Sequence, residues 1–221
     1  MKIHKYIDHT NLKPTATKQD IINLCEEAKK HHFFAVCINP CYIELAKENL
    51  KNTTIKVATV IGFPLGASTT ETKIFEAKNA IKNGADEIDM VLNIGALKAG
   101  DYSYVEKEIS LIKQAIGHHT LKVILENCYL SSDEITTACK LCLNAKADFV
   151  KTSTGFGTNG ATFKDVTIMN SVVDGESQIK AAGGIRDLET ALKFIEMGVT
   201  RLGTSSGVAL VTQGFTNQND Y

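Results

Sequence analysis

Residues 148–154 read DFVKTST, and residues 178–184 read QIKAAGG. Each stretch has a lysine directly after an apolar residue, and small residues or glycines follow that lysine. Short apolar runs that end in turn-forming residues are typical of parallel strands buried on both faces. Six further runs of this kind lie along the chain, and together they predict eight strands: KYID (5–8), FFAVCIN (33–39), KVATVIG (56–62), DEIDMVLN (86–93), LKVILEN (121–127), DFVKTST (148–154), QIKAAGG (178–184) and RLGTSS (201–206).

Segments with helical spacing separate the predicted strands, at 17–30, 69–82 and 187–197 among others. Ser131 or Ser132, followed by acidic residues, is typical of a helix start. For two of the helices the spacing predicts a buried face, made of Ile21, Leu24, Cys25 and Ala28 in the first and of Thr70, Ile74, Ala77 and Ile81 in the second.

Regular strand–helix alternation over 221 residues favours a single-domain α/β fold, a closed (β/α)8 TIM barrel. An open, doubly wound parallel sheet is the structural alternative. No linker or low-complexity stretch divides the chain. We therefore predict a catalytic barrel domain over residues 1–210 and a mobile C-terminal tail over residues 211–221.

Charge and hydropathy exclude several classes of protein. Lys+Arg (24) and Asp+Glu (25) nearly cancel, and the net charge is -1, so no basic excess indicates a nucleic-acid partner. The first ten residues lack the apolar region of a signal peptide, and no apolar run approaches the roughly 18 residues of a membrane helix. We expect a soluble, cytoplasmic protein without nucleic-acid or membrane partners.

The cysteines and histidines do not follow the spacing of a metal site. Cys139 and Cys142 form a C-x-x-C without a second pair, and together with Ile135 they have the spacing of one buried helix face. Two pairs of adjacent histidines, at 31–32 and 118–119, would point in different directions on a helix. We predict a buried helix face, exposed helix ends and no metal site.

Five charged residues are expected near the C-terminal ends of the strands, where barrels of this class have their active sites. Lysines on consecutive strands repel each other, and burial disfavours their charged form, so both effects lower a lysine pKa and free the amine as a nucleophile. A nearby carboxylate can accept a proton or orient a water. Ion pairing at strand ends is the alternative. The five residues are Asp8, Asp89, Glu126, Lys151 and Lys180.

We assign no catalytic role to four other residues. Lys56, Lys122 and Arg201 open their strands, so we expect their long side chains to reach solvent at the opposite end of the barrel. Cys37 has no histidine in an obvious partner position. We interpret it as a core or pocket-wall residue rather than as a nucleophile.

Glycine-rich turns follow the last two predicted strands, at Gly183-Gly184 and at 203–206. Loops in these places of a TIM barrel commonly bind phosphate through backbone N–H groups, although glycine can also serve the turn alone. The run GFGTNG (155–160) matches a dinucleotide-binding pattern, with Glu176 at a plausible distance. It follows the sixth strand instead of opening a first βαβ unit, so this match is weak.

Seven segments together closely resemble the deoxyribose-phosphate aldolase family: IDHT (7–10), VCINP (36–40), VIGFPLG (60–66), GADEIDMVLNIG (84–95), ADFVKTSTGF (147–156), KAAGGIRD (180–187) and RLGTSS (201–206). The match covers nearly the whole chain in order. It implies a TIM barrel that cleaves 2-deoxy-D-ribose 5-phosphate to D-glyceraldehyde 3-phosphate and acetaldehyde, with no metal or cofactor.

The resemblance also implies residue roles. Lys151 matches the Schiff-base lysine, Lys180 the second lysine, Asp89 the catalytic aspartate and Asp8 a further acid of the proton network. Lys180 is expected to lower the pKa of Lys151 and to take part in proton transfer. The predicted substrate-binding residues, including the pocket-wall cysteine, are Cys37, Thr154, Gly155, Gly183, Gly184, Ser205, Ser206 and Tyr221.

Departures from the family pattern lie outside the two lysines and Asp89. Asn11 replaces a leucine, ENCYL (126–130) replaces an ET-rich segment, and Phe156 stands where some members carry a phosphate-binding lysine. The turn at 157–160 also varies. Three alternatives remain open: another sugar-phosphate aldolase or isomerase, a nicotinamide-dependent oxidoreductase, and a non-catalytic sugar-phosphate sensor. The expected partners are a phosphorylated sugar, acetaldehyde and further copies of the chain, as a dimer or tetramer.

Overall fold

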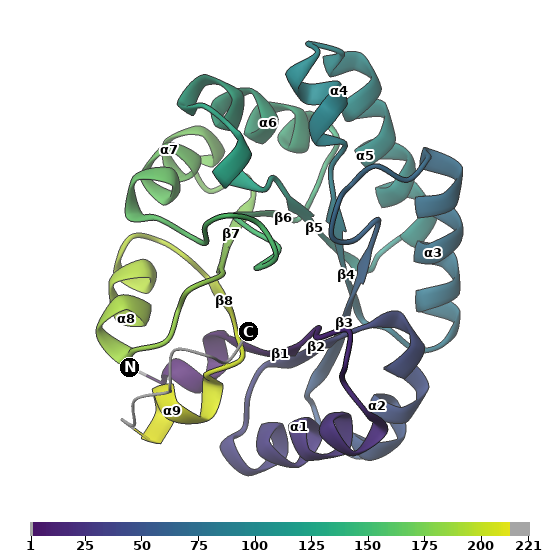
Figure 1. Cartoon of the computed structure of the whole chain (residues 1–221), viewed down its shortest axis with the longest axis vertical. Helices are drawn as coiled ribbons and strands as arrows, with labels where there is room; N and C mark the ends of the chain where they lie inside the picture. The colour runs from purple at the N-terminus through teal and green to yellow at the C-terminus, as the bar shows by residue number, and fades with distance from the viewer. Residues whose placement is uncertain (1, 213–221) are drawn as a thin grey trace.

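The computed structural model describes residues 2–212. In this range eight parallel strands form one closed barrel in chain order, and β8 pairs with β1. Figure 1 shows the helices arranged around the outside of the strands. The predicted TIM barrel is confirmed, and the open sheet is excluded. The strands are β1 (Ile7–Asn11), β2 (Ala35–Ile38), β3 (Lys56–Ile61), β4 (Glu87–Val91), β5 (Thr120–Ile124), β6 (Phe149–Lys151), β7 (Gln178–Ala182) and β8 (Arg201–Thr204).

Polar caps begin several helices, as the sequence predicts. Thr17 and Asp20 form a capping box at the start of α1, and Ser131 and Glu134 form another at the start of α6. The α-helices are α1 (Lys18–His31), α2 (Ile43–Asn49), α3 (Thr70–Lys82), α4 (Ile94–Lys98), α5 (Tyr102–Ile116), α6 (Ser132–Asn144), α7 (Phe163–Val173), α8 (Leu188–Glu196) and α9 (Gly207–Thr212), and the short 3-10 helices are η1 (Ile3–Tyr6), η2 (Pro40–Tyr42) and η3 (Asn127–Tyr129).

The first strand starts later than predicted. Residues 3–6 form η1 with Ile3 buried, and β1 begins only at Ile7. Asp8 is therefore the second residue of its strand and does not close it. Its Cα partners are Ala35, the first residue of β2, and Gly203 of β8. The carboxyl group lies inside the barrel, below the C-terminal strand ends, which corrects the predicted position of Asp8.

Helix α3 buries a wider face than the predicted one. Ala77 of the predicted face is fully buried, and Ile74 and Ile81 are half-buried against the core. Lys73, which was not predicted, is also fully buried between the helices. The Lys73 ammonium donates to Glu108 of α5 at 2.8 Å and to the Val91 carbonyl oxygen at 2.9 Å. A charge can be buried in this way because it has both an opposite charge and a hydrogen-bond acceptor.

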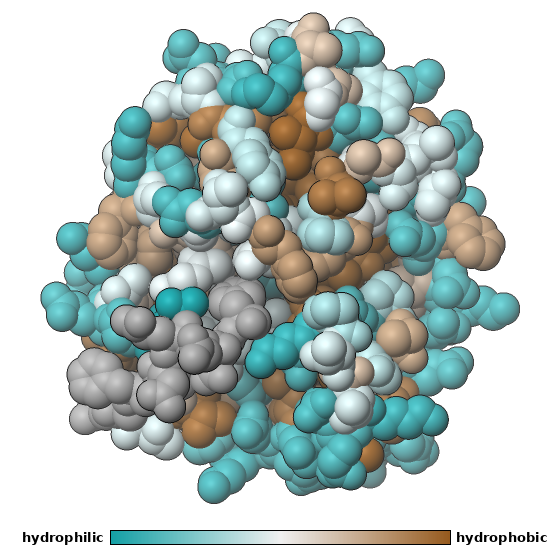
Figure 2. Space-filling view, in the orientation of Figure 1, coloured by the Kyte–Doolittle hydropathy of each residue, from teal (hydrophilic) through white to brown (hydrophobic). Residues whose placement is uncertain are grey.

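The outer core follows the predicted apolar spacing more closely. The α1 face predicted from the sequence is buried, and Ile135, Cys139 and Cys142 form a buried face of α6 in which both cysteines are free. Figure 2 shows a mostly hydrophilic rim, with apolar residues more frequent toward the middle of the same face. Within residues 2–212 no helix has the length and apolar character needed to cross a membrane.

The boundary between the barrel domain and the C-terminal tail stays a prediction. Helix α9 runs to Thr212, two residues beyond the predicted end of the barrel domain. Residues 213–221, which include Tyr221, lie outside the described residues.

Candidate active site

Asp89 lies at the centre of the buried charges. It is the third residue of β4, and its side chain is fully buried. One carboxylate oxygen, Oδ2, accepts from the ammonium groups of Lys151 at 2.7 Å and Lys180 at 2.8 Å. The other oxygen, Oδ1, accepts from Lys122 at 2.6 Å. One carboxylate therefore binds three ammonium groups.

Strand register explains this convergence. Lys151 and Lys180 are Cα partners in the β6–β7 ladder, and Asp89 and Lys122 are partners in the β4–β5 ladder. Paired residues of adjacent strands direct their side chains to the same face of the sheet. Both pairs face the barrel interior, so the lysines and the aspartate that the sequence singled out are brought together.

The ion pairs continue below Asp89 and form a closed ring. Lys180 donates to Asp8 at 2.5 Å, and Arg201 of β8 donates to Asp8 at 2.9 Å. Arg201 also donates to Glu87 at 2.9 Å, and Glu87 accepts from Lys122 at 2.6 Å. Because Lys122 and Lys180 both return to Asp89, the six groups alternate in charge around the interior. In order, the ring contains Asp8, Lys180, Asp89, Lys122, Glu87 and Arg201.

Two of these residues contradict our expectation from their position in the strand. Lys122 is fully buried and Arg201 is 5% exposed, so neither reaches solvent at the opposite end of the barrel. Their side chains turn inward, where carboxylates are available, and the Arg201 guanidinium also lies 3.6 Å from the centre of the Phe34 ring. Lys56, by contrast, is exposed as predicted. Strand position alone did not indicate which of the three faces the interior.

The ring shifts the pKa of each lysine differently. Burial and the Lys180 charge lower the pKa of Lys151, and the shared Asp89 offsets this only in part. Burial also opposes the charge on Lys180, but Asp8 and Asp89 outweigh it and raise the pKa of Lys180. The two lysines differ because Lys180 has a carboxylate on each side, whereas Lys151 has only a shared one. Lys180 therefore stays charged while Lys151 gives up its proton more readily.

The carboxylates remain ionised for the converse reason. Burial would raise the pKa of Asp89, but Lys122, Lys151 and Lys180 hold it well below its usual range. Asp8 behaves in the same way beside Arg201 and Lys180. Cys37, buried in β2 near Lys180 and Lys151, has a thiol whose pKa burial raises. The thiol therefore remains protonated.

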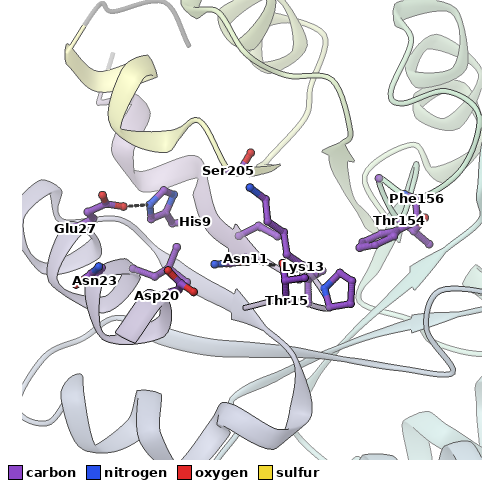
Figure 3. A pocket seen from close by; sticks show the side chains of 15 residues that line it. His9, Asn11, Lys13, Thr15, Asp20, Asn23, Glu27, Thr154, Phe156 and Ser205 are labelled. Carbon is purple, nitrogen blue, oxygen red and sulfur yellow. Dashed lines mark hydrogen bonds and ion pairs between the residues drawn. The ribbon is translucent and has the colours of Figure 1, made fainter. Parts of the chain in front are cut away.

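A pocket of about 740 Å³ opens at the C-terminal ends of β1, β6 and β8. Loops after β1, β6 and β8 line it together with one side of α1, as Figure 3 shows. Thr154, Gly155 and Ser205 of the predicted binding residues lie in its wall. Lys151, only 2% exposed, does not line this pocket. This pocket is therefore at the mouth of the barrel, and the candidate nucleophile is buried outside its lining.

Lys13 was not singled out from the sequence, yet it belongs to this pocket. Figure 3 shows its side chain extending toward Ser205. Its ammonium group makes no ion pair with any residue from 2 to 212. Phe156 lines the pocket too, and its ring meets that of Phe63 edge-on at 5.4 Å. The mouth therefore combines a cation and a hydroxyl group with an aromatic wall.

Glu126 lies at the C-terminal end of the barrel, as predicted, and holds the loop after β6. The carboxylate accepts from the Thr154 backbone N–H at 3.0 Å and from the Thr154 hydroxyl. It is 2% exposed, and its backbone is left-handed at φ 58°. The Thr154 hydroxyl also accepts from the Phe156 N–H at 2.9 Å. These contacts fix the loop that leads from Lys151 to the pocket.

Gly183 and Gly203, two glycines of the predicted phosphate region, each have a close packing partner. A side chain at Gly160 would meet the Gly183 carbonyl oxygen at 2.2 Å, and Gly183 itself has φ 85°. The close contact between the two backbones explains why residue 160 of the GFGTNG run is a glycine, with no need for a bound dinucleotide. Gly203 lies within β8, where a side chain would come within 3.0 Å of the Lys180 Cε atom. Gly203 thus makes room for Lys180 in the barrel interior.

Some predicted binding residues are not in the pocket wall. Gly183 and Gly184 follow β7 with left-handed backbones, and they do not line the 740 Å³ pocket. Ser206 is buried after β8, and Cys37 lies in the interior. Among residues 2–212 no group of three or more His, Cys, Asp or Glu side chains is arranged to hold a metal ion.

Comparison with known proteins identifies the class to which this barrel belongs. A family model described as DeoC/LacD family aldolase matches residues 2–212. The chain therefore belongs to the DeoC/LacD aldolase family.

Three individual proteins show which members of this family the chain is similar to. The chain is 58% identical over 216 residues to a deoxyribose-phosphate aldolase of Thermococcus gammatolerans, and the match covers 96% of each chain. It is 53% identical over 221 residues to one from Brevibacillus brevis, with both chains fully covered. A tetrameric deoxyribose phosphate aldolase structure from Aeropyrum pernix superposes with a TM-score of 0.87 at 31% identity, covering 96% of this chain and 90% of that one.

Proposed function

We propose that the protein is a class I aldolase that reversibly cleaves 2-deoxy-D-ribose 5-phosphate to D-glyceraldehyde 3-phosphate and acetaldehyde through a Schiff base on Lys151. The observation that carries this proposal is the position of Lys151. Lys151 is the last residue of β6, and its ammonium group contacts the same Asp89 oxygen as that of Lys180. The pKa of Lys151 is lowered. A neutral lysine amine is the nucleophile that Schiff-base chemistry requires.

The reaction would begin when the Lys151 amine attacks the aldehyde carbon, C1, of the open-chain sugar. Loss of water gives an iminium ion whose positive charge withdraws electrons. The C3 hydroxyl then loses its proton and the C2–C3 bond breaks. D-glyceraldehyde 3-phosphate departs, and the two remaining carbons stay bound to Lys151 as an enamine. Protonation of C2 and hydrolysis of the iminium release acetaldehyde and return the free amine.

Asp89 and Lys180 would support these proton transfers. A carboxylate with a depressed pKa is a weak base, so Asp89 would relay protons through a water molecule instead of retaining one. Lys180 would stay charged and keep the pKa of Lys151 low. Asp8 would hold Lys180 in place from the other side. The positive charge of the iminium would take the place of the ammonium charge beside Asp89.

The phosphate group would be recognised at the mouth of the barrel. Thr154, Gly155 and Ser205 line the pocket there, together with Lys13. Gly183, Gly184 and Ser206 would contribute from the ends of β7 and β8, where phosphate sites of TIM barrels commonly form. Cys37 would form part of the interior wall beside Lys151. Tyr221, outside the described residues, stays a predicted contact.

Cellular location and assembly belong to the same proposal. The protein would act in the cytoplasm, in deoxyribose catabolism and without a membrane partner. Its net charge of -1 also favours the absence of a nucleic-acid partner. It would form a dimer or tetramer. Light scattering coupled to size-exclusion chromatography would distinguish these assemblies from a monomer.

Trapping with acetaldehyde tests the chemistry directly. The protein is incubated with acetaldehyde and sodium borohydride, and intact mass and peptide mapping then locate any adduct. We expect one ethyl group on Lys151 and none in Lys151→Met. An adduct on a different lysine would contradict the assignment to Lys151. A folded protein without any adduct would exclude the aldolase and favour an isomerase or a sugar-phosphate sensor.

A further inference from the structure

The ion-pair ring has balanced charge. It contains three carboxylates, from Asp8, Glu87 and Asp89, and three cations, from Lys122, Lys180 and Arg201. Every member contacts two members of opposite charge at 2.9 Å or less. All six are at most 5% exposed. The ring is therefore neutral by itself, and water screens it little.

Lys151 is a seventh ionisable group that contacts the ring without an anion of its own to neutralise it. Its ammonium contacts Asp89, whose charge is already shared by Lys122 and Lys180. From β7 the charged group facing Lys151 is Lys180. From β2 the titratable group is the Cys37 thiol, which is protonated and carries no charge. A protonated Lys151 thus adds one unmatched positive charge to a buried interior, which burial disfavours strongly.

We propose that the charge balance of the ring selects Lys151 as the lysine that loses its proton, and that Glu87, Lys122 and Arg201 are positioning residues for the reaction. None of these three needs to touch the substrate. They act by fixing the number of charges around Asp89. The inference rests on the proposed Schiff-base function of Lys151, and it explains why that lysine is reactive while two others nearby remain charged.

The proposal predicts opposite effects for the two signs of charge. Glu87→Gln removes an anion, so a protonated Lys151 becomes less favourable and its titration midpoint should fall. Lys122→Met removes a cation, so a protonated Lys151 becomes balanced and the midpoint should rise. Each shift should be about one pH unit or more, as expected for a buried charge several ångströms away. The double variant removes one charge of each sign and should return the midpoint to that of the unchanged protein.

The experiment measures the protonation of Lys151 by two independent reactions. The rate of carbamylation of Lys151 by cyanate, followed by peptide mapping across pH, reports the neutral amine without aldolase chemistry. Acetaldehyde–borohydride trapping across the same pH range reports Schiff-base formation. Cyanate labelling with no trapping in the unchanged protein would remove the proposed function alone. Trapping with midpoints that do not follow the charge changes would remove the ring proposal alone.

A second double variant separates charge from geometry. Glu87→Gln with Arg201→Met breaks the ring but keeps the balance, since one anion and one cation are lost. We expect a lower melting temperature and an unchanged Lys151 midpoint. This variant also serves if a single substitution prevents folding, because no unmatched ring charge is left. A midpoint displaced by a pH unit in this variant, or shifts of equal sign in Glu87→Gln and Lys122→Met, would overturn the proposal.

Discussion

Replacing Lys180 with methionine removes the charge closest to the candidate nucleophile. The ammonium groups of Lys151 and Lys180 contact the same Asp89 oxygen at 2.7 and 2.8 Å, which sets them about 4–5 Å apart. At an effective dielectric constant of about 20, such a pair repels by about 3–4 kcal/mol, or roughly two to three pKa units. Lys180→Met also leaves Asp89 Oδ2 to Lys151 alone, which acts in the same direction.

The pH midpoint for trapping of Lys151 by acetaldehyde and borohydride should therefore rise by about two to three units. Below both midpoints, the trapping rate should fall about 100- to 1000-fold at a given pH, because the neutral fraction of the amine falls by that factor. The assay compares initial rates of adduct formation from pH 5 to pH 10, with peptide mapping to confirm that Lys151 carries the ethyl group.

Lys73→Met is the matched control. Lys73 is also fully buried and paired with a carboxylate, Glu108, but it lies between α3 and α5, outside the ring. Its loss should lower the melting temperature, since breaking a buried ion pair typically costs about 3–5 kcal/mol, and leave the trapping midpoint in place. A Lys180→Met midpoint that stays unchanged, or that moves to lower pH, would refute electrostatic coupling between the two lysines.

Three further outcomes follow from the same structure. Lys13→Met should raise KM for the phosphorylated sugar roughly 3–10-fold, since one exposed cation is lost from the pocket, and steady-state kinetics with unphosphorylated 2-deoxy-D-ribose should show no such change. Glu126→Gln should lower kcat at least several-fold and speed hydrogen exchange in the loop at Thr154, because two hydrogen bonds to a buried carboxylate are weakened. An unchanged exchange rate would contradict the role given to Glu126. Melting temperature should fall as pH drops below about 4, because Asp8 and Asp89 have depressed pKa values when folded, so their stabilisation is present above the unfolded pKa and is lost as they become protonated.

Strand order and the inward position of the main charges could be predicted because they depend on local patterns. Apolar runs, helical spacing and capping residues indicated the barrel, and the family resemblance indicated Lys151, Lys180 and Asp89. The start of β1 could not be predicted in this way. Lys5 and Tyr6 were predicted to begin the strand, whereas they belong to the 3-10 helix η1, which buries Ile3.

The lower half of the ring was missed for a different reason. From the sequence both Lys122 and Arg201 were expected at the start of their strands, where a long side chain can turn either to solvent or to the interior. Arg201 is indeed the first residue of β8, but Lys122 is the third residue of β5. The choice depends on partners from other strands, Asp89 and Glu87 for Lys122, and these contacts follow from ladder register. Glu87 lies beside Asp89 in DEID, two residues away on the same face of β4, and this alternation was the one available indication that both acids point inward.

The ring also divides unevenly along the chain. Its three anions all come from β1 and β4, in the first half of the barrel, and its cations, together with Lys151, all come from β5 to β8 in the second half. Neither half alone could bury its inward charges, because each would hold only one sign. A barrel made by duplicating either half would place like charges together at its centre. Synthesis from the N-terminus would leave the acidic half without neutralising partners until the later strands emerge, so closure of the barrel and neutralisation of its interior should be a single cooperative event.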